Sequence, residues 1–225
     1  MEKVLFCLPY AGGSSWNFNF LRNSVEQYDV KCLDYAGHGR RVGEKFMSNI
    51  EEIAEDFYKS IARIVENKPY SILGYSMGSI VAYELYRKIF EENRPLPEEI
   101  FFCASNSPES VHRSIDITDI NSLKKQLLAL NGTNESLLND IGFLNYYLPI
   151  YQNDIKMLNK YKFENGPSVE GKVHVLHSDE EDQYKGWINF SKETISFEYF
   201  KSGHFFVNEE PNKFLNIINK GKETT

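Results

Sequence analysis

One serine of this 225-residue sequence lies in a pattern that can turn its hydroxyl into a nucleophile. Residues 74–78 read Gly-Tyr-Ser-Met-Gly, with an apolar run before them and a helix-like run after them. A serine at the tip of a sharp strand-to-helix turn stands clear of the sheet, and flanking glycines avoid collision with the neighbouring strand and helix. The first amides of that helix also favour negative charge near the serine. Ser76 is therefore the candidate nucleophile, and the competing interpretation is an ordinary glycine-rich turn.

A serine hydroxyl is a poor nucleophile until a base takes its proton, and His204 is the histidine placed to do so. It follows the last strand-like run, where the carboxyl ends of parallel strands bring side chains to the same edge as Ser76. A carboxylate must fix the imidazole tautomer, and the acidic run 179–182 leaves the preceding strand. Serine, acid and histidine in this chain order are typical of α/β-hydrolases. His38, which lies between two glycines, is expected to shape its own loop.

Two backbone N–H groups are expected to stabilise the oxyanion that forms during acyl transfer. The N–H of Met77 directly follows the nucleophile, and the loop after the first strand supplies the second donor, for which Ala11 is the candidate. The glycines at 12 and 13 let a substrate approach the backbone of that loop. This chemistry requires no metal and no organic cofactor.

The elements that must position these residues are short apolar runs that alternate with helical patterns. This alternation predicts an α/β fold with a mostly parallel sheet flanked by helices. Together with the order serine, acid, histidine, it indicates an α/β-hydrolase. Residues 50–66 carry apolar side chains at three- and four-residue steps, so they are expected to form an amphipathic helix.

The alternation stops after Pro108. From Asp119 to Tyr161 only helical patterning is present, and Pro149 is expected to start a helix there. We interpret the chain as a single α/β-hydrolase domain over residues 1–225, with a helical lid at about 115–165 that covers the site. Helices that merely extend the core are the alternative.

Composition and charge argue against several function classes. The formal net charge of −7 does not suit a nucleic-acid surface, since phosphate binding requires a basic face. No apolar run approaches the roughly 20 residues that span a bilayer, and the apolar start of the chain is too short for a signal peptide. Three cysteines in strand-like runs are typical of packing in a reducing compartment. We expect a cytoplasmic monomer with neither nucleic-acid nor membrane partners.

Five ordered segments resemble the motif set of type II thioesterases, the stand-alone editing hydrolases that accompany nonribosomal peptide and polyketide synthases. They are Leu8–Gly13, Gly37–Gly39, Gly74–Gly78, Leu148–Asp154 and Ser202–Phe206. The resemblance implies that the protein hydrolyses acyl groups from the phosphopantetheine arm of acyl or peptidyl carrier protein domains. Candidate docking residues near the mouth of such a site are four cations, Arg40, Arg41, Lys124 and Lys125.

Two places depart from the family pattern. Gln152 stands where the lid motif usually has an arginine. The acid loop usually reads Gly-x-x-Asp, whereas Ser178 and Glu181 occupy those places here, with Asp182 directly after. Register favours Glu181 as the acid of the triad and residue type favours Asp182; our prediction is Glu181.

Two other functions fit the same residues. A carboxylesterase or lipase would use the same triad on oxygen esters. A hydrolase fold kept only as a ligand-binding module would need neither Ser76 nor His204, and the presence of both argues against it.

Overall fold

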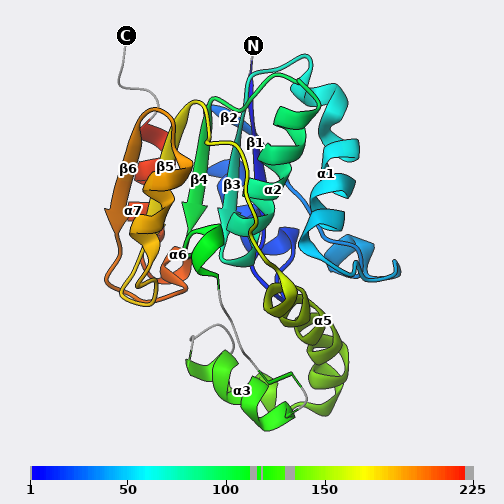
Figure 1. The fold of residues 1–225 in the computed structure, drawn as a ribbon. Coiled ribbons are helices and arrows are strands. Elements are labelled where there is room, and N and C mark those ends of the chain that lie inside the picture. The colour runs from blue at the N-terminus through cyan, green and yellow to red at the C-terminus, as the bar shows by residue number, and fades with distance from the viewer. Residues whose placement is uncertain (1, 112–115, 118, 130–134, 221–225) are drawn as a thin grey trace.

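Six parallel strands form one sheet, and the rest of the chain packs around it (Figure 1). The computed structural model describes residues 2–111, 116–117, 119–129 and 135–220. The strand order is β2-β1-β3-β4-β5-β6, so the direction of winding reverses between β1 and β3. The strands are β1 (Lys3–Leu8), β2 (Tyr28–Cys32), β3 (Tyr70–Tyr75), β4 (Glu99–Cys103), β5 (Lys172–His177) and β6 (Ile195–Tyr199). This is the predicted α/β-hydrolase architecture, and ligands of such sheets bind at the carboxyl ends of the strands near the reversal.

The central strands are apolar throughout because helices cover both of their faces. In β1, Val4, Phe6 and Leu8 belong to one core and Leu5 and Cys7 to the other. Helices α1 (Ile50–Val65), α2 (Met77–Glu91) and α5 (Ile141–Lys160) pack on the first face. The second face is covered by a 3₁₀ helix, η1 (Ser15–Asn23), and by α6 (Phe206–Glu209) and α7 (Pro211–Asn219).

The amphipathic helix predicted over residues 50–66 is α1, and the Asn49 side chain caps it by accepting the N–H of Glu52 at 2.7 Å. Two longer 3₁₀ helices are η1, given above, and η4 (Tyr184–Phe190). Two further 3₁₀ turns are η2 (Gly39–Arg41) and η3 (Pro108–Ser110).

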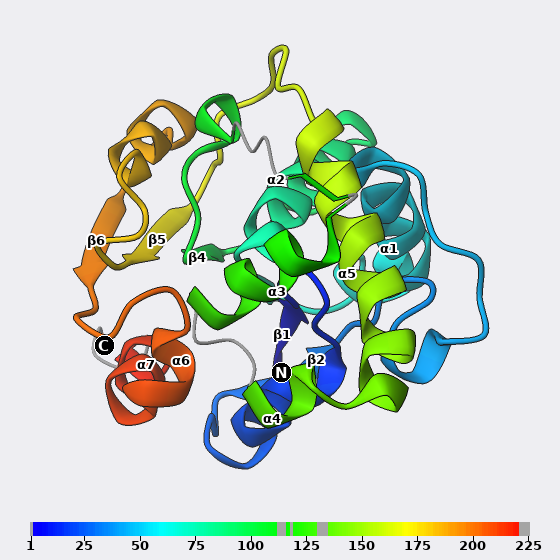
Figure 2. The same ribbon diagram turned by 90° about the horizontal axis from the view of Figure 1, so that it is seen from below.

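Three helices lie in the described part of the chain between η3 and β5. They are α3 (Ile120–Ala129), α4 (Glu135–Leu138) and α5. Residues 112–115, 118 and 130–134, some of which fall in the predicted lid, lie outside the described residues. In Figures 1 and 2, α3 and the first part of α5 lie beyond the edge of the sheet where the strands end.

The prediction that Pro149 starts a helix is wrong, because Pro149 lies inside α5. This helix begins eight residues earlier, where the Asp140 side chain accepts the N–H of Phe143 at 2.6 Å. Proline removes one backbone hydrogen bond from a helix. The helix continues through it, since Leu148, Ile150 and the residues that follow are buried and packing holds them in helical conformation.

Candidate active site

Ser76 occupies the tip of the turn between β3 and α2, and its backbone is strained. Its φ of 53° and ψ of −115° form a combination that side-chain-bearing residues rarely adopt. A Cβ at Gly74 would collide with the carbonyl oxygen of Gly78, and a Cβ at Gly78 would collide with that of Leu8. The N–H of Ser76 donates to the carbonyl oxygen of Cys103 at 2.8 Å, which helps to hold the turn. The two glycines therefore let strand, helix and loop close around the serine.

Three side chains form a continuous hydrogen-bonded chain at the carboxyl edge of the sheet. The Oγ of Ser76 lies 3.0 Å from Nε2 of His204, and Nδ1 of His204 lies 2.8 Å from Oε1 of Glu181. Ser76 follows β3, Glu181 follows β5 and His204 follows β6. All three residues are 5% exposed or less. Buried and in contact, they can pass a proton with little competition from bulk water.

The order of contacts sets the tautomer of His204. A carboxylate only accepts hydrogen bonds, so Nδ1 must carry the proton that points at Glu181. Nε2 is then left to accept the hydroxyl proton of Ser76. This is the arrangement in which an imidazole acts as a general base toward a serine.

Both carboxylate oxygens of Glu181 are occupied. Oε1 faces His204, and Oε2 accepts both the N–H and the hydroxyl of Ser178, each at 2.8 Å. Burial opposes ionisation of Glu181, but the hydrogen bonds from His204 and Ser178 outweigh it and lower the pKa of its carboxyl. Glu181 is therefore ionised at neutral pH.

Asp182, the other candidate for the acid, points elsewhere. Its side chain is exposed and accepts a hydrogen bond from the side-chain amide of Asn106 at 3.1 Å. The carbonyl oxygen of that amide accepts the N–H of Gln183 at 3.0 Å. Asp182 thus ties the acid loop to the segment after β4 and does not contact His204.

The oxyanion loop, which we define as residues 9–13, follows β1 and lies against the start of α2. A Cβ at Gly78 would meet the carbonyl oxygens of both Leu8 and Pro9, so loop and helix approach closely. Met77 is the first residue of α2, and its N–H has no acceptor within the helix. Among the hydrogen bonds between described residues, none uses the N–H of Ala11. Both predicted donors thus remain available, and their role stays a prediction.

A family model for the thioesterase domain matches residues 3–221. The chain belongs to this family. The resemblance drawn from the sequence motifs is thereby confirmed at the level of the family, over nearly the whole chain.

Named relatives of this thioesterase come from biosynthetic pathways. It is 24% identical over 227 residues to the gramicidin S biosynthesis protein GrsT of Aneurinibacillus migulanus, covering 96% of this chain and 87% of GrsT. ClbQ from the colibactin NRPS/PKS pathway has a TM-score of 0.90 at 23% identity, covering 98% of this chain and 96% of ClbQ. The type II thioesterase BorB from the borrelidin cluster has a TM-score of 0.87 at 24% identity, with 98% and 92% covered. At these identities the structural matches show the shared fold.

Two buried polar side chains of the thioesterase were not predicted to meet. Asp154 on α5 contacts both the oxyanion loop, through the N–H of Gly12 at 2.7 Å, and His38, through Nε2 at 2.8 Å. His38 does shape its loop, as expected, since Nδ1 lies 3.1 Å from the carbonyl oxygen of Ala36. The motif 148–154 flagged the segment that holds Asp154, but no sequence signal joined it to His38.

Gln152, the departure from the lid motif, makes a neutral contact in place of a salt bridge. Its side-chain amide donates to the carbonyl oxygen of Ile117 at 2.9 Å. The neighbouring Asn153 donates to the carbonyl oxygen of Met47 at 3.2 Å. Successive residues of α5 therefore fasten this helix to separate segments.

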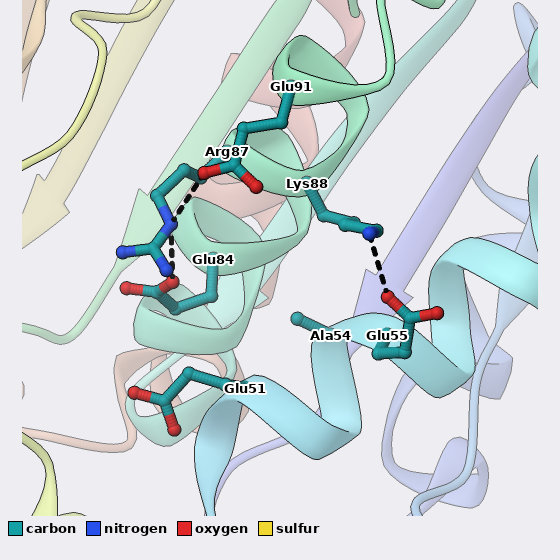
Figure 3. A pocket seen from close by; sticks show the side chains of 7 residues that line it. All are labelled: Glu51, Ala54, Glu55, Glu84, Arg87, Lys88 and Glu91. Carbon is teal, nitrogen blue, oxygen red and sulfur yellow. Dashed lines mark ion pairs between the residues drawn. The ribbon is translucent and has the colours of Figure 1, made fainter.

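A pocket between α1 and α2 is lined by charged side chains (Figure 3). Its cations are paired: Arg87 with Glu84 and Glu91, and Lys88 with Glu55. None of the three triad residues lines it, and we assign it no ligand.

The described residues contain no cluster of three or more histidine, cysteine or acidic side chains that could hold a metal ion. Within the same residues, no helix combines the length and the apolarity that crossing a membrane requires.

Proposed function

We propose that this thioesterase hydrolyses acyl groups from the phosphopantetheine thiol of carrier proteins, using Ser76, His204 and Glu181 as its triad. The observation that carries the proposal is the hydrogen-bonded chain from Ser76 through His204 to Glu181. The relatives support the substrate class, since GrsT, ClbQ and BorB are named for nonribosomal peptide, polyketide or antibiotic pathways. The protein then acts as an editing enzyme of the type II class, which clears misprimed or stalled acyl units.

The first half-reaction forms an acyl-enzyme. The Oγ of Ser76 attacks the thioester carbonyl carbon while Nε2 of His204 takes the hydroxyl proton. The carbonyl oxygen becomes an oxyanion that the N–H groups of Ala11 and Met77 stabilise. Collapse of this intermediate breaks the carbon–sulfur bond, and His204 gives its proton to the departing sulfur.

The second half-reaction releases the acid. His204 takes a proton from water, and the resulting hydroxide adds to the carbonyl carbon of the acyl-serine ester. Collapse breaks the bond to Oγ, and His204 returns the proton to Ser76. Glu181 stays ionised throughout and stabilises the imidazolium that forms twice per turnover.

The carrier protein should dock near the inserted helices. Arg41 is held by Glu44 at 2.7 Å and Asp56 at 2.6 Å, and Arg40 lies 3.3 Å from Asp34. These ion pairs leave the lysines on α3 as the better candidates among the four cations, Arg40, Arg41, Lys124 and Lys125.

The substrate class is tested by comparing the same acyl group in three substrates: the loaded carrier protein, the free pantetheine thioester and the oxygen ester. We expect kcat/KM for the acyl-loaded carrier protein to exceed that for the matching free pantetheine thioester by at least about tenfold, because docking adds binding energy. The matching oxygen ester should be slower still. Equal kcat/KM for the carrier-bound and free thioesters would contradict docking, and faster turnover of the oxygen ester would favour a carboxylesterase.

We propose that the lid consists of α3, α4 and the first turns of α5, within the single domain 1–225. Each of these helices presents apolar side chains to solvent, among them Ile120, Leu137, Ile141 and Tyr146, while Leu123, Leu127 and Leu138 turn toward the core. Leu148 and much of the helix after it are buried in the core. Hydrogen exchange should be fast in residues 120–129 and 135–146 and slow in residues 150–160, as in β3. Exchange as slow in α3 as in β3 would count against a mobile lid.

A cytoplasmic monomer suits this role. The three cysteines are buried and form no disulfide, in keeping with a reducing compartment. Size-exclusion chromatography with light scattering tests the oligomeric state directly.

A further inference from the structure

Asp154 is a carboxylate in an unusual place. It comes from α5, its exposed fraction is 0%, and it lies among the apolar side chains that join this helix to the core. A carboxylate is costly to bury unless it is paired and hydrogen-bonded. An acidic side chain at this position therefore needs a partner, and the structure provides two.

One oxygen of Asp154 serves both partners. Oδ2 accepts the N–H of Gly12 at 2.7 Å and faces Nε2 of His38 at 2.8 Å. Oδ1 is buried and has no hydrogen-bond partner among the described residues. A single atom thus joins α5, the oxyanion loop and the loop after β2.

The surroundings of His38 favour its protonated form. Its Nδ1 faces a carbonyl oxygen and its Nε2 faces the side chain of Asp154, so each ring nitrogen has an oxygen to which it can donate. Burial works against the charge, but the hydrogen bond to Asp154 outweighs it and raises the pKa of His38. Asp34 adds to the same effect, and the rings of Tyr35 and Phe46 pack against the imidazole. Asp154 and His38 therefore form a buried ion pair.

The contact with Gly12 orients the oxyanion loop. The N–H of Ala11 shares a peptide plane with the carbonyl oxygen of Tyr10, which accepts the N–H of Gly13 at 2.8 Å. Asp154 fixes the next peptide plane through Gly12. Two successive planes are thus held, and they aim the N–H of Ala11.

The backbone of Gly12 makes this contact at a position where a residue with a side chain would not fit. Gly12 has a φ of 74°, in the left-handed region, and a Cβ there would collide with the hydroxyl of Tyr147 on α5.

We propose that Asp154 is a positioning residue for the oxyanion loop and that His38 holds Asp154 in its working orientation. This inference rests on the proposed function, because it takes Ala11 as an oxyanion donor. A misaimed donor weakens binding of the oxyanion and leaves binding of the neutral carbonyl nearly unchanged. Loss of Asp154 should therefore lower kcat and leave KM nearly constant.

The test uses the full chain, a free acyl-pantetheine thioester and four variants. Removing one oxyanion donor costs about 10²–10³ in kcat, so Asp154→Ala, which misaims one, should lose about 10- to 100-fold with KM within about threefold. Asp154→Asn should lose less, about tenfold, because its oxygen can still accept the N–H of Gly12. Its amide nitrogen would then take the unpartnered place of Oδ1.

Asn153→Ala is the matched control, since Asn153 fastens the neighbouring turn of α5 to Met47 and contacts no part of the oxyanion loop in the hydrogen bonds of the described residues. Its kcat should stay within about twofold of wild type. Equal losses in Asn153→Ala and Asp154→Ala would overturn the proposal, because Asp154 would then serve only to attach the helix. Thermal unfolding shows whether each variant is folded. If Asp154→Ala fails to fold, the comparison of kcat between Asp154→Asn and Asn153→Ala decides the test.

The pH dependence of kcat in His38→Gln distinguishes a positioning role of His38 from a merely structural one. The pKa of His38 is raised, so its positive charge is fully present below its ordinary pKa of about 6.5 and is lost as pH rises through the raised pKa. The contribution of this charge to holding Asp154 is lost over the same pH range. Wild-type kcat should therefore decline on the alkaline side. Neutral His38 can still donate from Nε2, so the decline reflects loss of its positive charge. Glutamine is neutral at every pH, so His38→Gln should lack this decline, and an unchanged alkaline limb would overturn the role given to His38.

Labelling of Ser76 by a fluorophosphonate separates this inference from the proposed function. The phosphoryl oxygen of the probe gains negative charge in the same oxyanion hole, so the labelling rate needs no correct acyl substrate. Slow labelling of Asp154→Ala beside normal labelling of Asn153→Ala supports the inference even if wild type fails to turn over the thioester. Equal labelling rates for both variants would overturn it.

Discussion

Ser76→Ala should lower kcat on an acyl-pantetheine thioester by about 10⁶, the loss found when the nucleophile of a serine hydrolase is removed. Without Oγ no acyl-enzyme can form, and His204 loses the hydroxyl whose proton it accepts. Substrate binding and the two oxyanion donors remain, so a residual rate above that in water should persist. Single-turnover kinetics and mass spectrometry of the acyl-enzyme measure both effects.

The matched control is Ser71→Ala. Ser71 is the second residue of the same strand, near the end opposite to Ser76, where its hydroxyl lies 3.3 Å from that of Tyr28. Its removal should leave kcat within about twofold and should not prevent labelling of Ser76 by a fluorophosphonate. A folded Ser76→Ala protein that kept a tenth of wild-type turnover would refute the role of the serine.

Glu181→Gln should lower kcat by up to about 10⁴, because the imidazole would lose the charge that fixes its tautomer. The amide nitrogen of glutamine could face Nδ1 of His204 only if Nδ1 gave up its proton, which would place the proton on Nε2. Nε2 could then no longer accept the proton of Ser76. A kinetic comparison at saturating substrate measures this loss directly.

Asp182→Asn is the control for that prediction. Asp182 contacts Asn106 and is exposed, so its amide variant should retain most of the activity and lose only a little stability. An almost silent Glu181→Gln beside a crippled Asp182→Asn would reverse the assignment of the acid.

The parts of the site predicted from sequence are those with local signals. The turn at Ser76 needs glycines at fixed offsets, and a histidine after the last strand of a parallel sheet must reach the carboxyl edge. The sequence separates Glu181 from Asp182 less clearly, because the side chains of adjacent loop residues point in different directions. Only the register of the family's Gly-x-x-Asp loop favours Glu181. In the structure Ser178, which replaces the glycine of the family pattern, holds the second oxygen of the longer Glu181 side chain.

The parts that could not be predicted depend on tertiary contacts. His38 and Asp154 are 116 residues apart, and no periodicity in the sequence links a loop to a helix at that distance. The start of α5 was predicted wrongly because proline favours the first turn of a helix, whereas buried flanking residues keep Pro149 inside this one. The 3₁₀ form of η1 was likewise hidden, since short helical runs of both types share the same apolar spacing.

The fastening of α5 by Gln152, Asn153 and Asp154 limits how this enzyme can be re-engineered. A chimera that takes its lid from a relative would naturally exchange the helices between β4 and β5 as one cassette. A cassette cut after α5 would also replace Asp154, the residue that contacts the N–H of Gly12. A junction placed before Leu148 would exchange α3, α4 and the first turns of α5 and leave the native residues 148–160 in place. Selectivity and rate could then be varied separately.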